Sequence, residues 1–404
     1  MEYTNLINAR YIELARRSVI YPKFKVEVID ASETVVIKEI VQDIDASTGG
    51  SISISYQQGV RMSCSLTFIN KDSEYAPSAL SGMFWIGTKF RLFIGLYDDV
   101  SDDTYWFSEG VYYVNNPVVT KDFTSQLVTI EGIDKFGIFG SELGYNQLLG
   151  TYRIEAGQKI YDVINTILML EVGNGNVIDP IPPLFDPLYK DEVLPYDINK
   201  AQGSYLGDIL IELANILGAN IYYDKTGRLN IESGTLDISY SQDAAIWHFS
   251  EGDTEYMTSS LSYDFPNVIN VVKVIGNNVN GAVYSYIAEN NNPVSPTRIE
   301  YIGRKEMAPI ETPLATSEQR ARDYAEFKLN SLSIVQSTFD FQCSLLPHLD
   351  VDLVCTITDE YYGYNRQRFI IQSITMPLNI TSTMQISASN IASLPYYDLM
   401  VGGS

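Results

Sequence analysis

Several segments of this chain alternate between apolar and polar residues, and this period of two constrains the possible fold more than any other feature. In residues 62–68, the apolar Met, Cys, Leu and Phe are separated by Ser, Ser and Thr. Residues 24–28 and 90–94 follow the same pattern. Because successive side chains of a strand point to opposite faces of a sheet, such runs predict strands with one buried face. Three further strands are expected, at 52–54, 111–114 and 127–130.

A second region with this pattern follows residue 236. The sequence predicts six strands there, at 268–275, 283–287, 338–343, 353–357, 369–374 and 384–389. The 29 tyrosines of the chain also favour strands over helices. One helix interrupts the region, because Thr316 and Gln319 have the spacing of a capping box. Its buried stripe would consist of Ala321, Tyr324, Ala325 and Leu329.

Between these two regions the apolar period changes to that of a helix. Two helices are expected, at 160–168 and 206–216. Residues 221–231 then predict a hairpin with its turn at 224–227. The segment 179–195 is rich in proline and acidic residues, so it is expected to be an irregular loop.

The two β-rich regions resemble copies of one unit. Three strand segments recur in the same order, pairing 87–94 with 350–357, 111–117 with 370–377, and 125–130 with 382–387. This repetition predicts a duplicated domain, although two unrelated barrels could produce the same pattern. The expected fold class is mainly β with a small α+β insert, and each chain would contain two tube-like antiparallel β-barrels. Three such chains arranged head-to-tail would form a homotrimeric ring with pseudo-sixfold symmetry.

We therefore expect five parts along the chain. They are a helical segment at 1–19, a first tube-like barrel at 20–150, the α+β insert at 151–235, a second tube-like barrel with one helix at 236–395, and a tail at 396–404. The helix of the first part would span 5–17, where the residues expected on one side are Ile7, Tyr11, Leu14 and Ala15.

The charge of the chain is strongly negative, with 50 acidic against 27 basic residues and a net charge of −23. Such a surface repels phosphate backbones, which argues against a reader of nucleic-acid sequence. An acidic channel wall would let DNA slide without binding, and solubility is the other explanation of the charge. Neither a leader nor an apolar run of about 18 residues is present, so a soluble, unexported chain without a membrane segment is expected.

No catalytic or metal-binding site stands out. Both histidines, His248 and His348, are expected to be structural, and Cys64, Cys343 and Cys355 are expected to be buried thiols. The tightest acidic clusters are Asp98, Asp99, Asp102 and Asp103, and Asp43 with Asp45. The first cluster is expected in a solvated turn, with Ca²⁺ binding as the alternative. We therefore assign no catalytic, cofactor-binding or metal-binding residue and do not expect an enzyme.

Parts of both halves resemble the phage baseplate hub, or tail hub, family. The segments that carry the resemblance are 60–96, 267–276, 311–329, 346–357 and 368–389. In the family, a loop with proline and an acidic residue follows the helix and opens the next strand, and here that loop is 347–350. The resemblance implies a homotrimer of tube-like barrels around a channel. Its expected partners are a tail tube or distal tail protein, a tape measure protein, a central spike or tail lysin, and baseplate wedge proteins.

The resemblance also implies a structural role at the tip of a phage tail, in a virion assembled in the host cytoplasm. The chain would continue the tail-tube channel, adapt the sixfold tube to a threefold spike, and let DNA pass transiently. It ends at Ser404 without the long extension that carries lysin or receptor-binding domains in some relatives, so hydrolysis of the host wall is not expected. The alternative is a phage-borne receptor- or carbohydrate-binding β-protein. Protein packing is preferred over sugar binding for Tyr361, Tyr362, Tyr364, Tyr396 and Tyr397.

Overall fold

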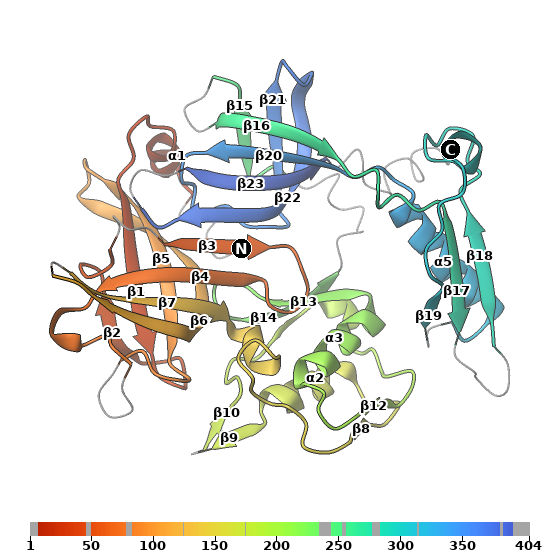
Figure 1. Cartoon of the computed structure of the whole chain (residues 1–404), viewed down its shortest axis with the longest axis horizontal. Helices are drawn as coiled ribbons and strands as arrows, with labels where there is room; N and C mark the ends of the chain where they lie inside the picture. The colour runs from red at the N-terminus through yellow and green to blue at the C-terminus, as the bar shows by residue number, and fades with distance from the viewer. Residues whose placement is uncertain are drawn as a thin grey trace.

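The computed structural model describes residues 7–45, 50–77, 83–123, 125–173, 175–233, 244–252, 256–276, 283–312, 315–379 and 383–390. The protein is mainly β, as the sequence predicts, and one large sheet dominates it (Figure 1). No described helix is both long and apolar enough to cross a membrane.

The first half of the chain supplies one part of this sheet. Its strands are β1 (Pro22–Ile29), β2 (Val36–Ile40), β3 (Ser51–Ser55), β4 (Met62–Ile69), β5 (Lys89–Asp98), β6 (Asp103–Lys121) and β7 (Gln126–Asp134). Short 3₁₀ turns follow β4 and β7, namely η1 (Lys71–Ser73) and η2 (Lys135–Phe139). In β4 the apolar residues of the alternating run are buried, while Ser63 stays exposed. The period-two prediction is therefore confirmed for this strand.

The second half supplies the other part. Its strands are β15 (Trp247–Ser250), β16 (Tyr256–Tyr263), β20 (Ser337–Cys343), β21 (Val354–Asp359), β22 (Tyr364–Pro377) and β23 (Met384–Asn390). The sheet runs in the order β16-β20-β23-β22-β3-β4-β7-β6-β5-β1-β2, with β21 also beside β22 and β15 beside β21. It is continuous because β3 pairs with β4 on one edge and with β22 on the other.

We call the junction of β3 and β22 the seam. It joins Ser51–Ser55 to residues 373–377 in antiparallel register, and Ile54 lies opposite Ile374. The described strands do not close into a barrel, so two tube-like barrels remain a prediction. An isolated bridge from Ile44 to Phe68 nevertheless returns the segment after β2 to β4.

The two halves repeat one succession of strands. β5, β6 and β7 form an antiparallel meander, and so do β21, β22 and β23. The third sequence alignment is wrong by one residue, because it matches the buried Val128 to the exposed Gln385. Instead Met384 and Ile386 face inward as Val128 does. The correct alignment of the two strands depends on which residues face the core. The few identical residues in the two segments could not define it.

The insert follows the first half. It contains β8 (Tyr152–Ile154), α2 (Ile160–Leu168), β9 (Glu171–Gly173), β10 (Asn176–Val177), β11 (Leu184–Phe185), η3 (Pro187–Tyr189), β12 (Ile198–Lys200), α3 (Leu206–Leu217), β13 (Ala219–Tyr223) and β14 (Leu229–Ser233). Both predicted helices and the predicted β13–β14 hairpin are confirmed. The expected irregular loop contains β11, which pairs in parallel with β14.

A separate lobe lies between β16 and β20. It consists of β17 (Val271–Gly276), β18 (Ser285–Glu289), α4 (Ile299–Ile302), β19 (Ile310–Thr312) and α5 (Glu318–Leu332). The strands form their own sheet in the order β18-β17-β19. Its core is distinct from the main one and consists of Val272, Val274, Ala288, Ala315, Ala321, Ala325 and Leu329. Figure 1 shows the lobe beside the main sheet.

This lobe differs from the sequence-based expectation, in which its strands belong to the second β-barrel. A period of two identifies a strand but not its neighbours, because pairing is decided by distant segments. The predicted helix exists, but Ser317 rather than Thr316 is its N-cap. The Ser317 side chain accepts from the backbone N–H of Arg320, so the helix begins one residue later than the capping box predicts.

Candidate functional site

The main sheet presents one continuous polar face. Its members lie opposite one another across six strand pairs, and outside β16 they alternate with mostly buried residues. They are Ser51, Ser53, Ser55, Ser63, Ser65, Thr67, Thr129, Glu131, Thr258, Ser260, Ser262, Thr338, Asp340, Gln342, Ser373, Thr375, Gln385, Ser387 and Ser389. This set, which we call the polar face, has two carboxylates and no lysine or arginine. The sequence-based expectation of a strongly acidic wall therefore does not describe it, because hydroxyl and amide groups predominate.

Hydrogen bonds between neighbouring strands fix the side chains of the polar face. Ser387 donates to Asp340 Oδ1 at 2.6 Å, and the hydroxyls of Thr67 and Thr129 lie 3.0 Å apart. A groove of 390 Å³ runs over this face where β16, β20, β22 and β23 meet, with Asp340 among its lining residues. The groove is lined by polar groups, so it does not resemble the mainly apolar pockets that hold small molecules.

Among the described strands of the main sheet, several edges are open, namely those of β2, β15 and β16 and part of the edge of β6. β16 has β20 as its only neighbour among the described strands. The second part of β6, Asn115–Lys121, has β7 on one side and no described strand on the other, because β5 pairs only with residues 103–113. Val118 and Val119 in this part are 56% and 50% exposed. Unpaired edges with exposed apolar side chains are sites where another chain can add a strand.

The insert hairpin β13–β14 reaches both halves close to the seam. At its turn, Lys225 Nζ lies 2.6 Å from Glu109 Oε2 in β6 and donates to the carbonyl oxygens of Pro347 (3.3 Å) and Leu349 (2.8 Å). Both charged side chains are buried. Burial raises the pKa of Glu109 to about 8, and the Lys225 ammonium opposes this shift. The sequence around Glu109 does not mark it as a buried carboxyl group, because its partner Lys225 lies 116 residues later in the chain.

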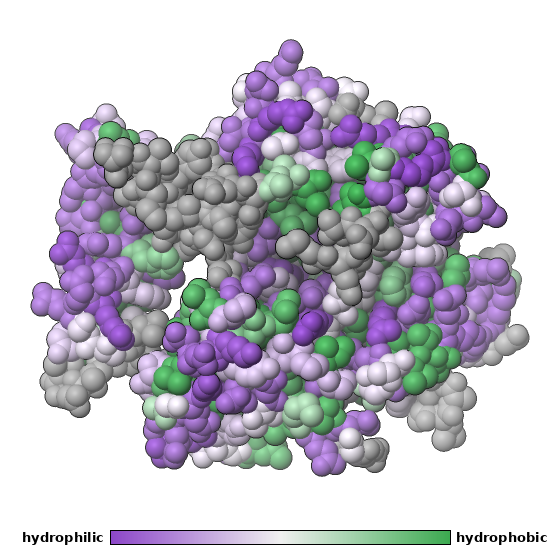
Figure 2. Space-filling model, turned by 180° about the vertical axis from the view of Figure 1, so that it is seen from behind, coloured by the Kyte–Doolittle hydropathy of each residue, from purple (hydrophilic) through white to green (hydrophobic). Residues whose placement is uncertain are grey.

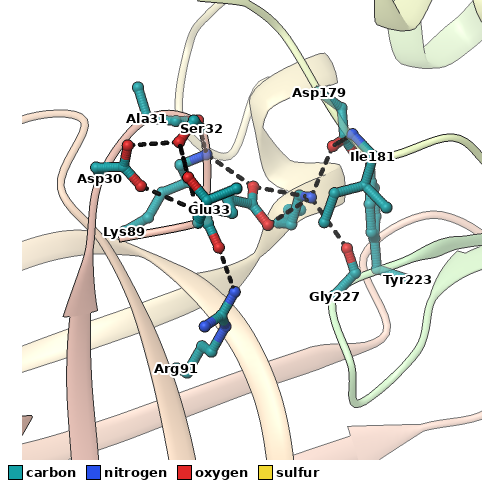
Figure 3. Close-up of polar contacts among 12 residues, drawn as sticks. Asp30, Ala31, Ser32, Glu33, Lys89, Arg91, Asp179, Ile181, Tyr223 and Gly227 are labelled. Atoms are coloured by element: carbon teal, nitrogen blue, oxygen red, sulfur yellow. Dashed lines mark hydrogen bonds and ion pairs between the residues drawn. The ribbon is translucent and has the colours of Figure 1, made fainter. Parts of the chain in front are cut away.

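A second buried ionic network holds the insert to the first half (Figure 3). Lys135 Nζ lies 2.9 Å from Glu33 Oε1 and 2.9 Å from Asp179 Oδ1. Lys89 Nζ lies 2.7 Å from Glu33 Oε1, and burial lowers the pKa of Lys89. Tyr223 of β13 donates to Asp179 at 2.6 Å. Five segments of the chain therefore meet in one charge-compensated cluster, which sequence reasoning missed because its members are far apart.

The turn between β3 and β4 is fastened to the same hairpin. The backbone N–H of Gly59 donates to Ile221 at 2.9 Å, and the Arg61 guanidinium lies 3.4 Å from the Tyr222 ring centroid. Asp134 accepts from the backbone N–H of Arg61 at 2.7 Å. Burial raises the pKa of Asp134 to about 7. The hairpin thus supports the seam through contacts with both of its sides.

The predicted acidic cluster is only partly solvated. Asp98 is buried and accepts from Arg10 of the first helix, α1 (Ala9–Ala15), at 2.5 Å. Asp99 accepts from Arg17 at 2.8 Å. The expectation of a solvated turn is therefore wrong for Asp98, because α1 lies against this turn although it is distant in sequence. No three described His, Cys, Asp or Glu residues are grouped to hold a metal, and the absence of a metal site stays a prediction.

Both predicted structural histidines make internal contacts. His348 is buried, its Nδ1 lies 2.6 Å from the Tyr11 hydroxyl, and its ring packs against Trp247. Burial, together with the nearby Lys225 charge, lowers the pKa of His348 to about 3. His248 Nδ1 lies 2.9 Å from Thr356 Oγ1.

The remaining predicted residues have mixed outcomes. The prediction of buried thiols is confirmed, because Cys64, Cys343 and Cys355 are buried and free. Asp43 accepts from Tyr75 at 2.6 Å. Tyr361 is 86% exposed, whereas Tyr362 and Tyr364 pack edge-on against Phe339. Tyr396 and Tyr397 lie outside the described residues.

The fold is shared with solved tail proteins. The tail protein from Neisseria meningitidis MC58 matches with a TM-score of 0.62 and 11% identity, over 93% of this chain and 98% of that one. The 43 kDa tail protein of prophage MuSo2 from Shewanella oneidensis matches with a TM-score of 0.58 and 13% identity, over 91% and 97%. A chain of the half-lidded Francisella PdpA–VgrG complex matches with a TM-score of 0.54 and 10% identity, over 97% and 62%.

These likenesses define the fold class as that of phage and prophage tail proteins, which is also the fold of a chain in the PdpA–VgrG complex. The expected resemblance is confirmed at the level of the fold, which this chain shares with tail proteins. No family model and no curated protein sequence matches the chain.

Proposed function

We propose that this protein is a structural hub of a phage tail tip, in which three copies form a ring around a channel. The ring would continue the tail tube and adapt its sixfold symmetry to a threefold spike. The seam is the observation that carries this proposal, because in it a strand of the first half pairs with a strand of the second half.

Within the chain, the first half contributes β3 to the seam and the second half contributes the free part of β22. In the repeat, β16 of the second half corresponds to β3 of the first half, because β16 pairs with β20 as β3 pairs with β4. The second part of β6 corresponds to that part of β22. Both are open edges of the main sheet. Pairing β16 of one copy with Asn115–Lys121 of the next would repeat the seam between chains, and three such junctions would close a ring.

The polar face would then line the channel. The opposite face of the same strands is buried in the main core, with Ile52, Ile54 and Ile374 almost fully covered, so only the polar face is free to border a lumen. It offers phosphate groups no cation, while Glu131 and Asp340 would repel them. DNA would therefore pass without binding, and the proposed partners remain the tube or distal tail protein, the tape measure protein, the spike or lysin, and the wedge proteins.

The Val119→Asp variant tests the proposal. Val119 is half exposed in the single chain, so the new carboxylate should leave the subunit folded but place a charge in the proposed junction. Light scattering across a concentration series, together with negative-stain microscopy, should find open-centred threefold rings for the wild type and single subunits for the variant. Val100→Asp is the matched control, because Val100 is 75% exposed in the turn between β5 and β6 and should leave the rings intact.

Two results would contradict the proposal. A wild-type chain that stays monomeric at millimolar concentration, also with a tail tube protein added, would exclude a self-assembling hub. Rings that form equally well with Val119→Asp would show that β6 is not the junction.

A further inference from the structure

An exposed aromatic pair stands at the end of β16. Tyr263 and Phe265 stack with ring centroids 6.0 Å apart and an interplanar angle of 8°, and their side chains are 55% and 64% exposed. Aromatic side chains with this exposure are characteristic of binding surfaces. The pair lies in the short connection that leads from β16 into the lobe.

This connection is ordered by the lobe itself. Lys305 Nζ donates to the carbonyl oxygens of Phe265 at 2.8 Å and Pro266 at 3.1 Å. In the same segment, the Asp264 N–H donates to the carbonyl oxygen of Gln336, which lies just before β20, at 3.0 Å. The backbone that carries the pair is therefore held in place before any partner binds, which lowers the entropy lost on association.

A second exposed apolar site lies at the start of β5. Trp85 and Ile86 are 42% and 75% exposed in a tight turn, in which the Thr88 N–H donates to the Trp85 carbonyl oxygen at 3.0 Å. In the repeat, the alignment of 87–94 with 350–357 makes this turn the counterpart of residues 347–349. Leu349, the counterpart of Ile86, is fully buried. No described residue covers Trp85 and Ile86 to that extent.

The counterpart residues 347–349 contact the insert hairpin close to the seam. Inside the chain, the insert hairpin lies at the β3–β4 end of the seam, where Lys225 binds the carbonyl oxygens of residues 347 and 349. At the corresponding β16–β20 end, the connection to the lobe takes the place of the β3–β4 turn. In Figure 1 the lobe lies beyond the ends of β16 and β20, and the insert lies below β3 and β4. Figure 2 shows hydrophobic patches between hydrophilic areas on the rear surface.

We infer that Tyr263 and Phe265 of one copy pack on Trp85 and Ile86 of the next copy. This inference rests on the proposed ring, and it gives the lobe a role as the brace of the junction between subunits. Within one chain the insert hairpin braces the seam, and between chains the lobe does. The occupant is a second copy because the aromatic pair ends β16, and the turn at 85–88 is bonded through Thr88 to Val114 beside the open part of β6, so both sites adjoin the edges that the proposed ring pairs between copies.

Cysteine cross-linking of the full-length chain tests the inference. Phe265→Cys chains are mixed with Ile86→Cys chains and oxidised, and a disulfide-linked dimer should form that contains one chain of each kind. Phe265→Cys mixed with Val100→Cys is the control, and it should give no mixed dimer. The three native cysteines are buried, so they should not interfere.

Sedimentation gives a second measurement. The double variant Tyr263→Ala/Phe265→Ala should weaken self-association by about tenfold or more. Leu188→Ala, which truncates another exposed side chain (70%), should leave self-association unchanged. If rings form but the mixed dimer and the loss of affinity are both absent, the inference is wrong and the hub proposal stands. If no wild-type ring forms, both are refuted.

Discussion

Removing the ammonium of Lys225 should destabilise the protein more than any change to a surface charge. Lys225 Nζ contacts Glu109 at 2.6 Å and the carbonyl oxygens of Pro347 and Leu349, and both charged side chains are nearly inaccessible to water. The Lys225→Met variant leaves the buried Glu109 carboxyl group, whose pKa of about 8 keeps it largely protonated at pH 7, and two buried carbonyl oxygens without their donor. Each buried polar group left without a partner costs about 1–3 kcal/mol, so we expect the free energy of unfolding to fall by about 3–5 kcal/mol.

Urea unfolding at pH 7, followed by tryptophan fluorescence, measures this loss. Lys159→Met is the control, because Lys159 and Asp191 form a solvent-exposed ion pair at 2.8 Å. This variant should unfold at a urea concentration close to that of the wild type. The double variant Glu109→Leu/Lys225→Met should recover much of the stability, because an apolar pair avoids the desolvation of both charges. A Lys225→Met midpoint equal to that of Lys159→Met, or a double variant no better than the single one, would refute the reasoning.

Two further predictions concern the same part of the molecule. The pKa of His348 lies at about 3, below the ordinary 6.5, so the unfolded chain binds a proton more readily and stability falls as pH drops from 6.5 towards 3. At pH 4.5 this amounts to about 3 kcal/mol, and a His348→Gln variant should lose that part of the pH dependence in urea titrations. Gly227 has φ +81° and a Cβ there would lie 2.4 Å from Val111 Cγ2, so Gly227→Ala should lower the unfolding free energy by about 2 kcal/mol or more. Gly252→Ala, with φ +89° but no atom within 4 Å, should cost only the backbone strain, and equal thermal midpoints for the two alanine variants would contradict the predicted clash.

Many of the strands could be predicted because their information is local, whereas β2, β15 and β16 were not predicted. The alternation in β4, the period of α2 and α3, and the turn of the β13–β14 hairpin all lie within a few residues of one another. The order of strands in the meanders also follows from the sequence repeat. What could not be predicted is which segment pairs with which across long separations, and the lobe around α5 is the main example.

The buried charges were missed for the same reason. Nothing near Glu109 in the sequence distinguishes it from a surface carboxylate, since its partner Lys225 comes 116 residues later. Asp98 was expected in water because its neighbours are acidic, whereas Arg10 lies 88 residues away. A single sequence reports composition around a residue, but desolvation depends on the elements that fold over it.

The seam also sets an order of events during synthesis. β3 finds β4 as soon as both leave the ribosome, but its other edge has no partner until β22 emerges about 320 residues later. At about 5–20 residues per second, that edge stays open for roughly 15 to 60 seconds. An open edge can recruit a strand from a neighbouring nascent chain, and its serines reduce the hydrophobic gain from such a mistake. A polysome producing this protein therefore holds many half-sheets at once, and translation speed between residues 55 and 373 becomes a determinant of yield.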